Sequence, residues 1–145
     1  MTTYHDIHSK ITTHLEASSF VNTVSKGSIF NIDTKKTTMF PLSHIMIDNV
    51  AYEGNVLIYN VSVLAMDIVP DHDGEIDVTD YIHNTQLSVL VNLLESVRRG
   101  DMWSNNLHLV SDSVTIEPWE DRFENALAGW TASFSLAIAN SAVIC

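Results

Sequence analysis

The segment from Trp130 to Ala139 carries the most regular alternation of hydrophobic and small positions in the chain. The apolar positions are Trp130, Ala132, Phe134, Leu136 and Ile138, and between them lie Thr131, Ser133, Ser135, Ala137 and Ala139. Successive side chains on a β-strand point to opposite faces of its sheet. The pattern therefore predicts a closing strand with one apolar face and one small, partly hydroxylated face that carries no charge.

Two earlier segments predict a β-hairpin. Residues His44 to Ala51 indicate a strand entered through Phe40-Pro41-Leu42, because proline lacks a backbone donor and suits the start of a strand. Glu53-Gly54-Asn55 supplies a turn. The stretch from Val56 to Val69 is apolar on both faces, which is typical of a central strand covered on both sides. Shorter strands are indicated within residues 21–33 and 107–116, where we expect Pro118 to end the second of them.

Two segments have helical periodicity. Tyr4, Ile7, Ile11 and Leu15 recur at helical spacing and predict an amphipathic helix from about Thr3 to Ser18. A long helix is expected from Asp77 to Arg99, with basic residues in its last turn and Gly100 as its stop. Its buried stripe is predicted to be Val78, Tyr81, Ile82, Leu87, Leu90, Val91, Leu94 and Val97. Its exposed face is expected to be polar and nearly uncharged, with Gln86, Ser88, Asn92 and Ser96.

These elements predict a single domain, residues 1–145, of the α+β class. We expect a mainly antiparallel sheet of about four to five strands, with the long helix and the N-terminal helix packed on it. A length of 145 residues and a hydrophobic fraction of 46% are sufficient for a packed core.

Charge narrows the classes of function. The formal net charge is -11, with seven basic residues scattered along the chain, so a groove that grips nucleic-acid backbone is not expected. An acidic wall instead repels phosphate, which leaves passing DNA mobile. The single cysteine, Cys145, excludes an intrachain disulfide and a site with several cysteine ligands. The N-terminus does not resemble a signal peptide, and no apolar run approaches the length of a membrane span, so we expect a protein made in a cytoplasm.

An acidic run, Asp71, Asp73, Glu75 and Asp77, is the first candidate site. Aligned on Gly74 as an EF-hand calcium loop, Asp71 and Asp73 fall at ligand positions, but Val69 and Asp80 occupy the first and twelfth positions. An acidic loop that leads into a helix N-terminus explains the run without a metal. We therefore expect a loop that faces either solvent or the lumen of an assembly.

No catalytic or cofactor motif is present. The seven histidines lack metal-ligand spacing, and no nucleophile elbow or glycine-rich phosphate loop occurs. We therefore expect no enzyme activity, no cofactor and no metal. A small cytosolic metal-dependent enzyme that uses the histidines with Asp71 and Asp73 is the alternative from a different class.

The second candidate site is the uncharged side of the closing strand, formed by Thr131, Ser133 and Ser135. Neutral faces of small residues suit contacts between subunits. Two alternatives are open: a second helix or a loop of the same chain covers this face, for which the N-terminal helix is available, or a second copy of the chain does.

The order helix, hairpin, long helix and closing strand resembles the tail terminator, or tail completion, proteins of tailed bacteriophages. The resemblance rests on the helix that ends near Ser18, the entry through Phe40-Pro41-Leu42, the strand Val56–Val69, the helix Asp77–Arg99 and the strand entered through Gly129-Trp130. No invariant motif defines that family, so no residue role is transferred.

The resemblance implies a structural virion protein, made in the host cytoplasm, that forms a ring with copies of itself, usually a hexamer. Such a ring caps the tail tube and joins it to the neck and head connector, and DNA passes through its lumen without specific binding. It implies no membrane partner. Another neck component, a head–tail adaptor or stopper, is the nearest alternative.

Overall fold

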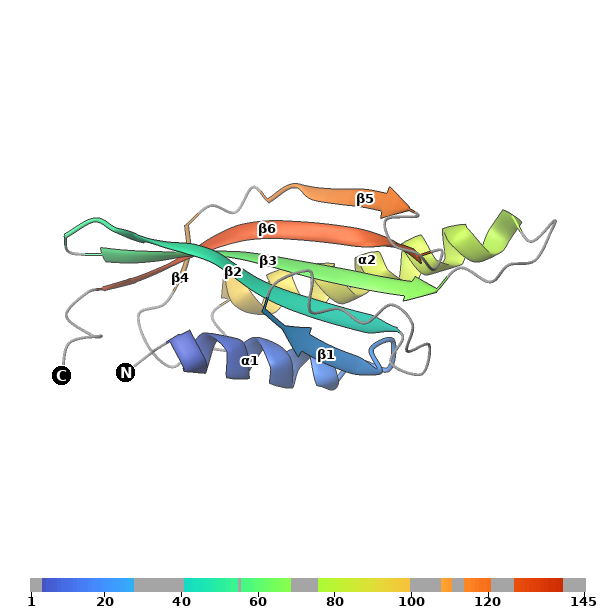
Figure 1. Cartoon of the computed structure of the whole chain (residues 1–145), viewed down its shortest axis with the longest axis horizontal. Helices are drawn as coiled ribbons and strands as arrows, with labels where there is room; N and C mark the ends of the chain where they lie inside the picture. The colour runs from blue at the N-terminus through green and yellow to red at the C-terminus, as the bar shows by residue number, and fades with distance from the viewer. Residues whose placement is uncertain are drawn as a thin grey trace.

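The computed structural model describes residues 4–27, 41–54, 56–68, 76–99, 108–110, 114–120 and 127–139. Two helices and six strands lie within these ranges (Figure 1). In chain order they are α1 (Tyr4–Glu16), β1 (Thr23–Lys26), β2 (Leu42–Tyr52), β3 (Val56–Ile68), α2 (Ile76–Arg99), β4 (His108–Leu109), β5 (Ile116–Glu120) and β6 (Leu127–Ala139).

The six strands form one sheet in the order β1-β2-β3-β6-β4, and β5 pairs with the same edge of β6 as β4. The β1–β2 pair is parallel, and all other pairs are antiparallel. This confirms the predicted α+β class and the mainly antiparallel sheet. The sheet has one strand more than the predicted four to five, because β4 and β5 are separate strands where the sequence indicated a single one within residues 107–116.

Strand β3 is the centre of the sheet, as its two-sided hydrophobicity predicts. It pairs with β2 on one side and, over its whole length from Val56 to Ile68, with β6 on the other. Val61 and Val63 are buried on one face, and Leu64 and Met66 are buried on the opposite face. The hairpin turn contains Gly54 at a positive φ of 71°, a backbone conformation that glycine adopts without a steric penalty.

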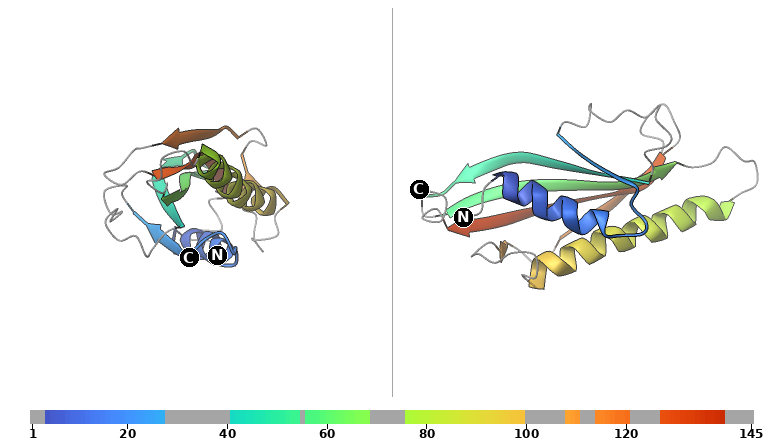
Figure 2. Two further views of the ribbon diagram at one scale, coloured as in Figure 1. Left: turned by 90° about the vertical axis from the view of Figure 1, so that its right-hand side faces the viewer. Right: turned by 90° about the horizontal axis from the view of Figure 1, so that it is seen from below.

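Both helices lie on the same face of the sheet (Figure 2). The apolar side of β6 packs against the helices in the core between the two layers, as the alternation in that strand predicts. Trp130 Nε1 donates a hydrogen bond of 2.7 Å to the carbonyl of His83 and so ties β6 to α2. The fully or nearly fully buried core residues are Ile7, Ile11, Leu15, Ile45, Tyr59, Val61, Val63, Ala65, Val89, Leu90, Leu93, Val97, Ala132, Phe134 and Leu136.

The predicted buried stripe of α2 is partly wrong. Tyr81 and Val91 are 63% and 43% exposed, and the buried stripe instead passes through the polar residues Thr85 and Gln86. Both polar side chains have backbone partners: Thr85 Oγ1 donates to the carbonyl of Ile82 at 3.2 Å, and Gln86 Nε2 donates to that of Phe20 at 3.3 Å. A pattern that counts only apolar residues passes over buried polar positions of this kind. Gln86 is therefore not on the exposed face where it was expected.

The expectation that Pro118 ends a strand is also wrong. Strand β5 continues through Pro118, which pairs with Trp130 of β6. Within the described residues β5 has no second neighbour, and an edge strand tolerates a residue without a backbone donor.

Candidate functional site

The face of the sheet opposite α1 and α2, called here the open face, carries the predicted hydroxyl residues of β6. Residues 127, 129, 131, 133, 135 and 137 alternate with those that enter the core. Helix α1 packs on the other face, against β1 and α2, so it does not cover Thr131, Ser133 and Ser135. The N-terminal helix is thereby excluded as the cover of this face.

A β-bulge in β2 adds polar side chains to the open face. The register with β3 shifts between Ile47 and Asn49, which leaves Asp48 as the extra residue. Because a bulge sets two residues against one on the neighbouring strand, Asp48 and Asn49 both turn toward the side of β3 that carries Ser62 and Asn60. The bulge thus places a carboxylate and a carboxamide next to each other on a single face.

These side chains form two rows of hydrogen bonds across β2, β3 and β6, called here the polar ladder (Asp48, Asn49, Asn60, Ser62, Ser133 and Ser135). In the first row Ser62 Oγ donates to Asp48 Oδ2 at 2.7 Å. Because that bond uses the only proton of the Ser62 hydroxyl, Ser133 Oγ, 3.1 Å away, donates to Ser62 Oγ.

The second row is parallel to the first. Asn60 Nδ2 donates to Asn49 Oδ1, and Ser135 Oγ donates to Asn60 Oδ1 in a short contact. Ser133 is exposed, and Ser135 is half-buried. The ladder is therefore an ordered polar surface with a single formal charge, at Asp48.

Thr131 lies between this surface and the buried end of the open face. Its hydroxyl oxygen is inaccessible to solvent and has no hydrogen-bond partner among the described residues. Beyond it, Leu42, His44, Leu64 and Met66 are almost completely buried. The three predicted hydroxyl residues of β6 thus lie together on one face but in different environments.

The predicted acidic site is not placed by the structure. Asp71, Asp73 and Glu75 lie outside the described residues. Asp77 belongs to the first turn of α2, but its side chain is not among those that the structure describes. Whether this run faces a lumen or solvent stays a prediction.

Sequence reasoning missed a serine–histidine pair that joins β1 to β2. Ser25 Oγ lies 2.6 Å from His44 Nδ1, and His44 Nε2 lies 2.9 Å from the carbonyl oxygen of Gly27. A carbonyl oxygen only accepts, so Nε2 carries the proton and Nδ1 accepts from the Ser25 hydroxyl. The ring is fully buried and both nitrogens are engaged, so the pair fixes the parallel strand β1 rather than presenting a nucleophile. No local pattern links residues 25 and 44; only the pairing of the strands brings them together.

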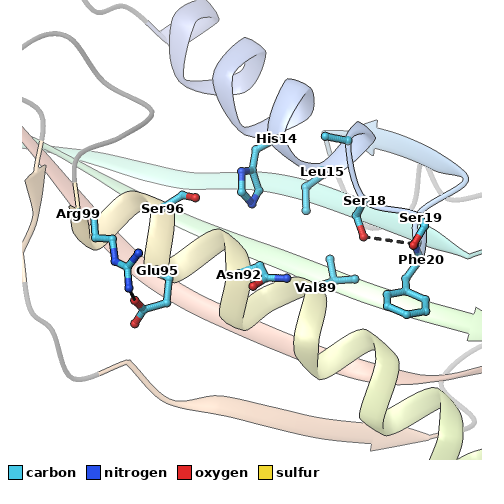
Figure 3. A pocket seen from close by; sticks show the side chains of 11 residues that line it. His14, Leu15, Ser18, Ser19, Phe20, Val89, Asn92, Glu95, Ser96 and Arg99 are labelled. Atoms are coloured by element: carbon cyan, nitrogen blue, oxygen red, sulfur yellow. Dashed lines mark hydrogen bonds and ion pairs between the residues drawn. The ribbon is translucent and has the colours of Figure 1, made fainter.

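A groove of about 470 Å³ separates the end of α1 from α2 (Figure 3). His14, Phe20 and Asn92 line it, and burial lowers the pKa of the His14 imidazole. At one end, Glu95 forms ion pairs with Arg98 at 2.9 Å and with Arg99 at 3.2 Å, and the Arg98 hydrogen bond is the main cause of the lowered pKa of the Glu95 carboxyl. The groove is thus lined by the half-buried imidazole of His14 and by the carboxylate of Glu95, which is already paired with two arginines.

Within the described ranges, no three His, Cys, Asp or Glu side chains are grouped closely enough to hold a metal ion. Among the same residues, no helix combines the length and apolarity needed to cross a bilayer. No protein-family model matches the chain, and no curated protein matches it.

Proposed function

We propose that this chain is a structural virion protein that assembles into a ring at the head-proximal end of a phage tail, where it caps the tail tube and joins it to the neck. The polar ladder is the single observation that carries the proposal. It is an ordered, nearly uncharged surface on a chain whose net charge is -11. A solvated face of an acidic protein normally carries charge, whereas surfaces that pack between subunits are depleted of it.

Two further features support assembly. Val50 and Tyr52, at the end of β2 near the hairpin turn, are 44% and 73% exposed, and aromatic residues are enriched in subunit contacts. Strand β1 pairs only with β2 within the described residues, so its other edge has backbone groups that a neighbouring chain can pair with.

The acidic composition supports the passage of DNA through the ring. A lumen that gains little from phosphate contacts does not trap a moving duplex, because tight backbone binding depends on clustered Lys and Arg. The connection to the tail tube and the neck comes from the family resemblance in the order of elements. Neighbouring genes for portal, tube or tape-measure proteins would support it directly.

Charge placed on the ladder tests the proposed interface. We expect Ser133→Arg and Ser133→Glu to abolish assembly, because a charge of either sign must lose its water in a neutral contact. Both variants should keep the melting temperature of the isolated chain close to that of the parent, since Ser133 is exposed. A carboxylate at position 133 is also close to Asp48, because Ser62 is hydrogen-bonded to both Ser133 and Asp48. Ser133→Arg is included because the carboxylate of Asp48 does not repel an arginine.

The control is Ser19→Glu, a charge at an exposed serine in the turn after α1. Mass in solution and thermal unfolding are measured separately for all three variants. Loss of assembly in both Ser133 variants but not in Ser19→Glu supports the interface. Normal assembly of both Ser133 variants contradicts it.

A further inference from the structure

The groove between α1 and α2 is a partly apolar hollow in the helical layer. Leu15 and Val89 line it together with Phe20, whose side chain is 41% exposed. Figure 3 shows Phe20 at one end of the groove and Arg99 at the other. Ten residues of α2 separate Val89 from Arg99, so the α2 wall is about 15 Å long. The volume of about 470 Å³ falls in the range of about 300–1,000 Å³ that accepts a bound group.

The β2–β3 hairpin extends beyond both helices at one end of the molecule (Figures 1 and 2). Val50 and Tyr52 lie on the face of the sheet that carries the helices, because their partners on β3 are Tyr59 and Leu57, which belong to the core. Since α1 and α2 end short of the hairpin turn, Val50 and Tyr52 are 44% and 73% exposed. The hairpin tip (Val50, Tyr52 and Glu53) therefore presents the kind of surface that helices cover elsewhere on this sheet.

The charges of the hairpin tip and of the groove are opposite. Glu53 is exposed and forms no ion pair within the described residues. Its backbone N–H donates a hydrogen bond of 3.0 Å to the carbonyl of Val56, which fixes the turn. In the groove, Arg98 already contacts both carboxylate oxygens of Glu95, and Arg99 shares one of them at 3.2 Å. Arg99 can therefore pair with a second carboxylate.

We propose that the hairpin tip of one copy inserts into the groove between α1 and α2 of the next copy. The inference rests on the proposed self-assembly and names a contact by which the copies join. Because the tip and the groove are different surfaces of one chain, the contact is head-to-tail, and repeated contacts of that kind form a ring when their rotation closes. The polar ladder lies on the opposite face of the sheet, so the two contacts use separate surfaces.

The lengths of the two surfaces agree. An extended segment from Val50 to Glu53 spans about 10 Å, which fits along an α2 wall of about 15 Å. With Glu53 at the Arg99 end, Val50 lies toward Phe20, so the apolar part of the tip meets the apolar part of the groove.

The middle of the groove suits the Tyr52 side chain. A tyrosine brings an apolar ring and a hydroxyl that needs a hydrogen-bond partner when it is buried. His14 and Asn92 line the groove between its two ends (Figure 3). Burial lowers the pKa of the His14 imidazole, so the ring is neutral near pH 7 and one of its nitrogens can accept from the Tyr52 hydroxyl.

Removal of the tyrosine tests the contact. Tyr52→Ser should raise the protein concentration at half-assembly about tenfold or more, because tyrosines in central pockets are among the residues that dominate interfaces. The unfolding midpoint of the isolated chain should stay close to that of the parent, since Tyr52 is 73% exposed. Tyr81→Ser is the matched control: Tyr81 is 63% exposed on α2 and does not line the groove, so this variant should assemble like the parent.

Charge reversal tests the orientation of the tip. Glu53→Arg and Arg99→Glu should each weaken assembly, because each places two like charges at the same contact. The variant with both changes should recover assembly, since the pair is then restored with its signs exchanged.

A disulfide identifies the neighbouring surfaces. Glu53→Cys is mixed with Ser96→Cys, a groove residue three positions before Arg99, and both chains also carry Cys145→Ser. Each chain then has one cysteine, so the expected disulfide dimer forms in the mixture but in neither variant alone. The control is Ser9→Cys, at an exposed serine of α1 that does not line the groove, which should not cross-link to Glu53→Cys.

The outcomes separate this contact from the proposed ring. Absence of the cross-link in the mixture, or equal assembly of Tyr52→Ser and Tyr81→Ser, would overturn the inference. If the Ser133 variants lose assembly in that case, the proposed ring stands without this contact. A parent chain that is monomeric at every concentration overturns both.

Discussion

The contact between β3 and β6 at Gly129 gives the sharpest stability prediction. A Cβ atom built on Gly129 would lie 2.0 Å from the carbonyl oxygen of Ala65 and 2.9 Å from the Cα of Met66. Both atoms belong to the backbone of β3, so no rotamer change relieves the clash. The two strands must separate locally, in the most extensively paired part of the sheet.

Overpacking of a well-packed region costs roughly 1–3 kcal/mol, and a clash with backbone belongs at the upper end of that range. Alanine recovers about 0.5–1 kcal/mol through the lower entropy of the unfolded chain. We therefore expect Gly129→Ala to reduce the free energy of unfolding by about 2 kcal/mol. At roughly 2–4 °C per kcal/mol for a chain of this size, the melting temperature should fall by about 4–8 °C.

Urea and thermal denaturation followed by circular dichroism measure this change. Gly54→Ala is the matched control, because its φ is positive but a new Cβ has nothing within 4 Å. Its cost should be limited to the left-handed backbone, about 1 kcal/mol. Gly129→Ala as stable as the parent, or less destabilising than Gly54→Ala, would refute the close approach of β3 and β6.

Three further changes test the core and the buried histidines. Phe134→Ala should lower the free energy of unfolding by about 3–5 kcal/mol in urea denaturation, because it leaves a cavity between the sheet and the helices, and a cost under 1 kcal/mol would contradict its burial. Ser25→Ala should cost about 1–3 kcal/mol in the same assay, because it removes the donor to buried His44, and an unchanged midpoint would contradict that hydrogen bond. Burial lowers the pKa of both His8 and His14 in the folded state, so below about pH 6.5 the unfolded chain binds more protons. The free energy of unfolding should therefore fall as the pH is lowered from 6.5 to 5.5. A variant with both histidines changed to glutamine should lose less of it over that interval, and an identical pH dependence would contradict the lowered pKa values.

The regular elements followed from the sequence because their patterns are strong. The alternation in β6 and the two-sided run in β3 match the pairing of these strands, and the stripe Ile7, Ile11 and Leu15 is completely buried. The errors occur where burial does not follow hydrophobicity. Gln86 is buried because it reaches the backbone of Phe20, whereas Tyr81 is exposed although it is aromatic.

The candidate surface was predicted only in part. The neutral side of β6 is readable because Thr131, Ser133 and Ser135 recur with the period of a strand. The positions of Asp48 and Asn49 on β2 are not, because a bulge between Ile47 and Asn49 shifts the side-chain alternation of that strand by one residue. A one-residue shift moves every later side chain to the other face, and nothing in the sequence around Asp48 marks it.

A pocket of about 330 Å³ that is lined by residues of α1 and β1 is harder to predict from the sequence. His5 and His8 are neighbours on one helix, but Lys26 lines the same pocket only because β1 folds back along α1. The pair Ser25–His44 depends in the same way on the parallel pairing of β1 with β2. Such sites depend on the topology of the fold, which cannot be read from the hydrophobic periodicity of a single helix or strand.

Assembly is the central claim, and the mass of the chain in solution tests it most directly. Light scattering coupled to size-exclusion chromatography, repeated over a range of protein concentrations, measures that mass without reference to any partner. A ring of six 16.2 kDa chains predicts about 97 kDa, either throughout or in a concentration-dependent equilibrium with the monomer. A mass of 16.2 kDa at every concentration would contradict it.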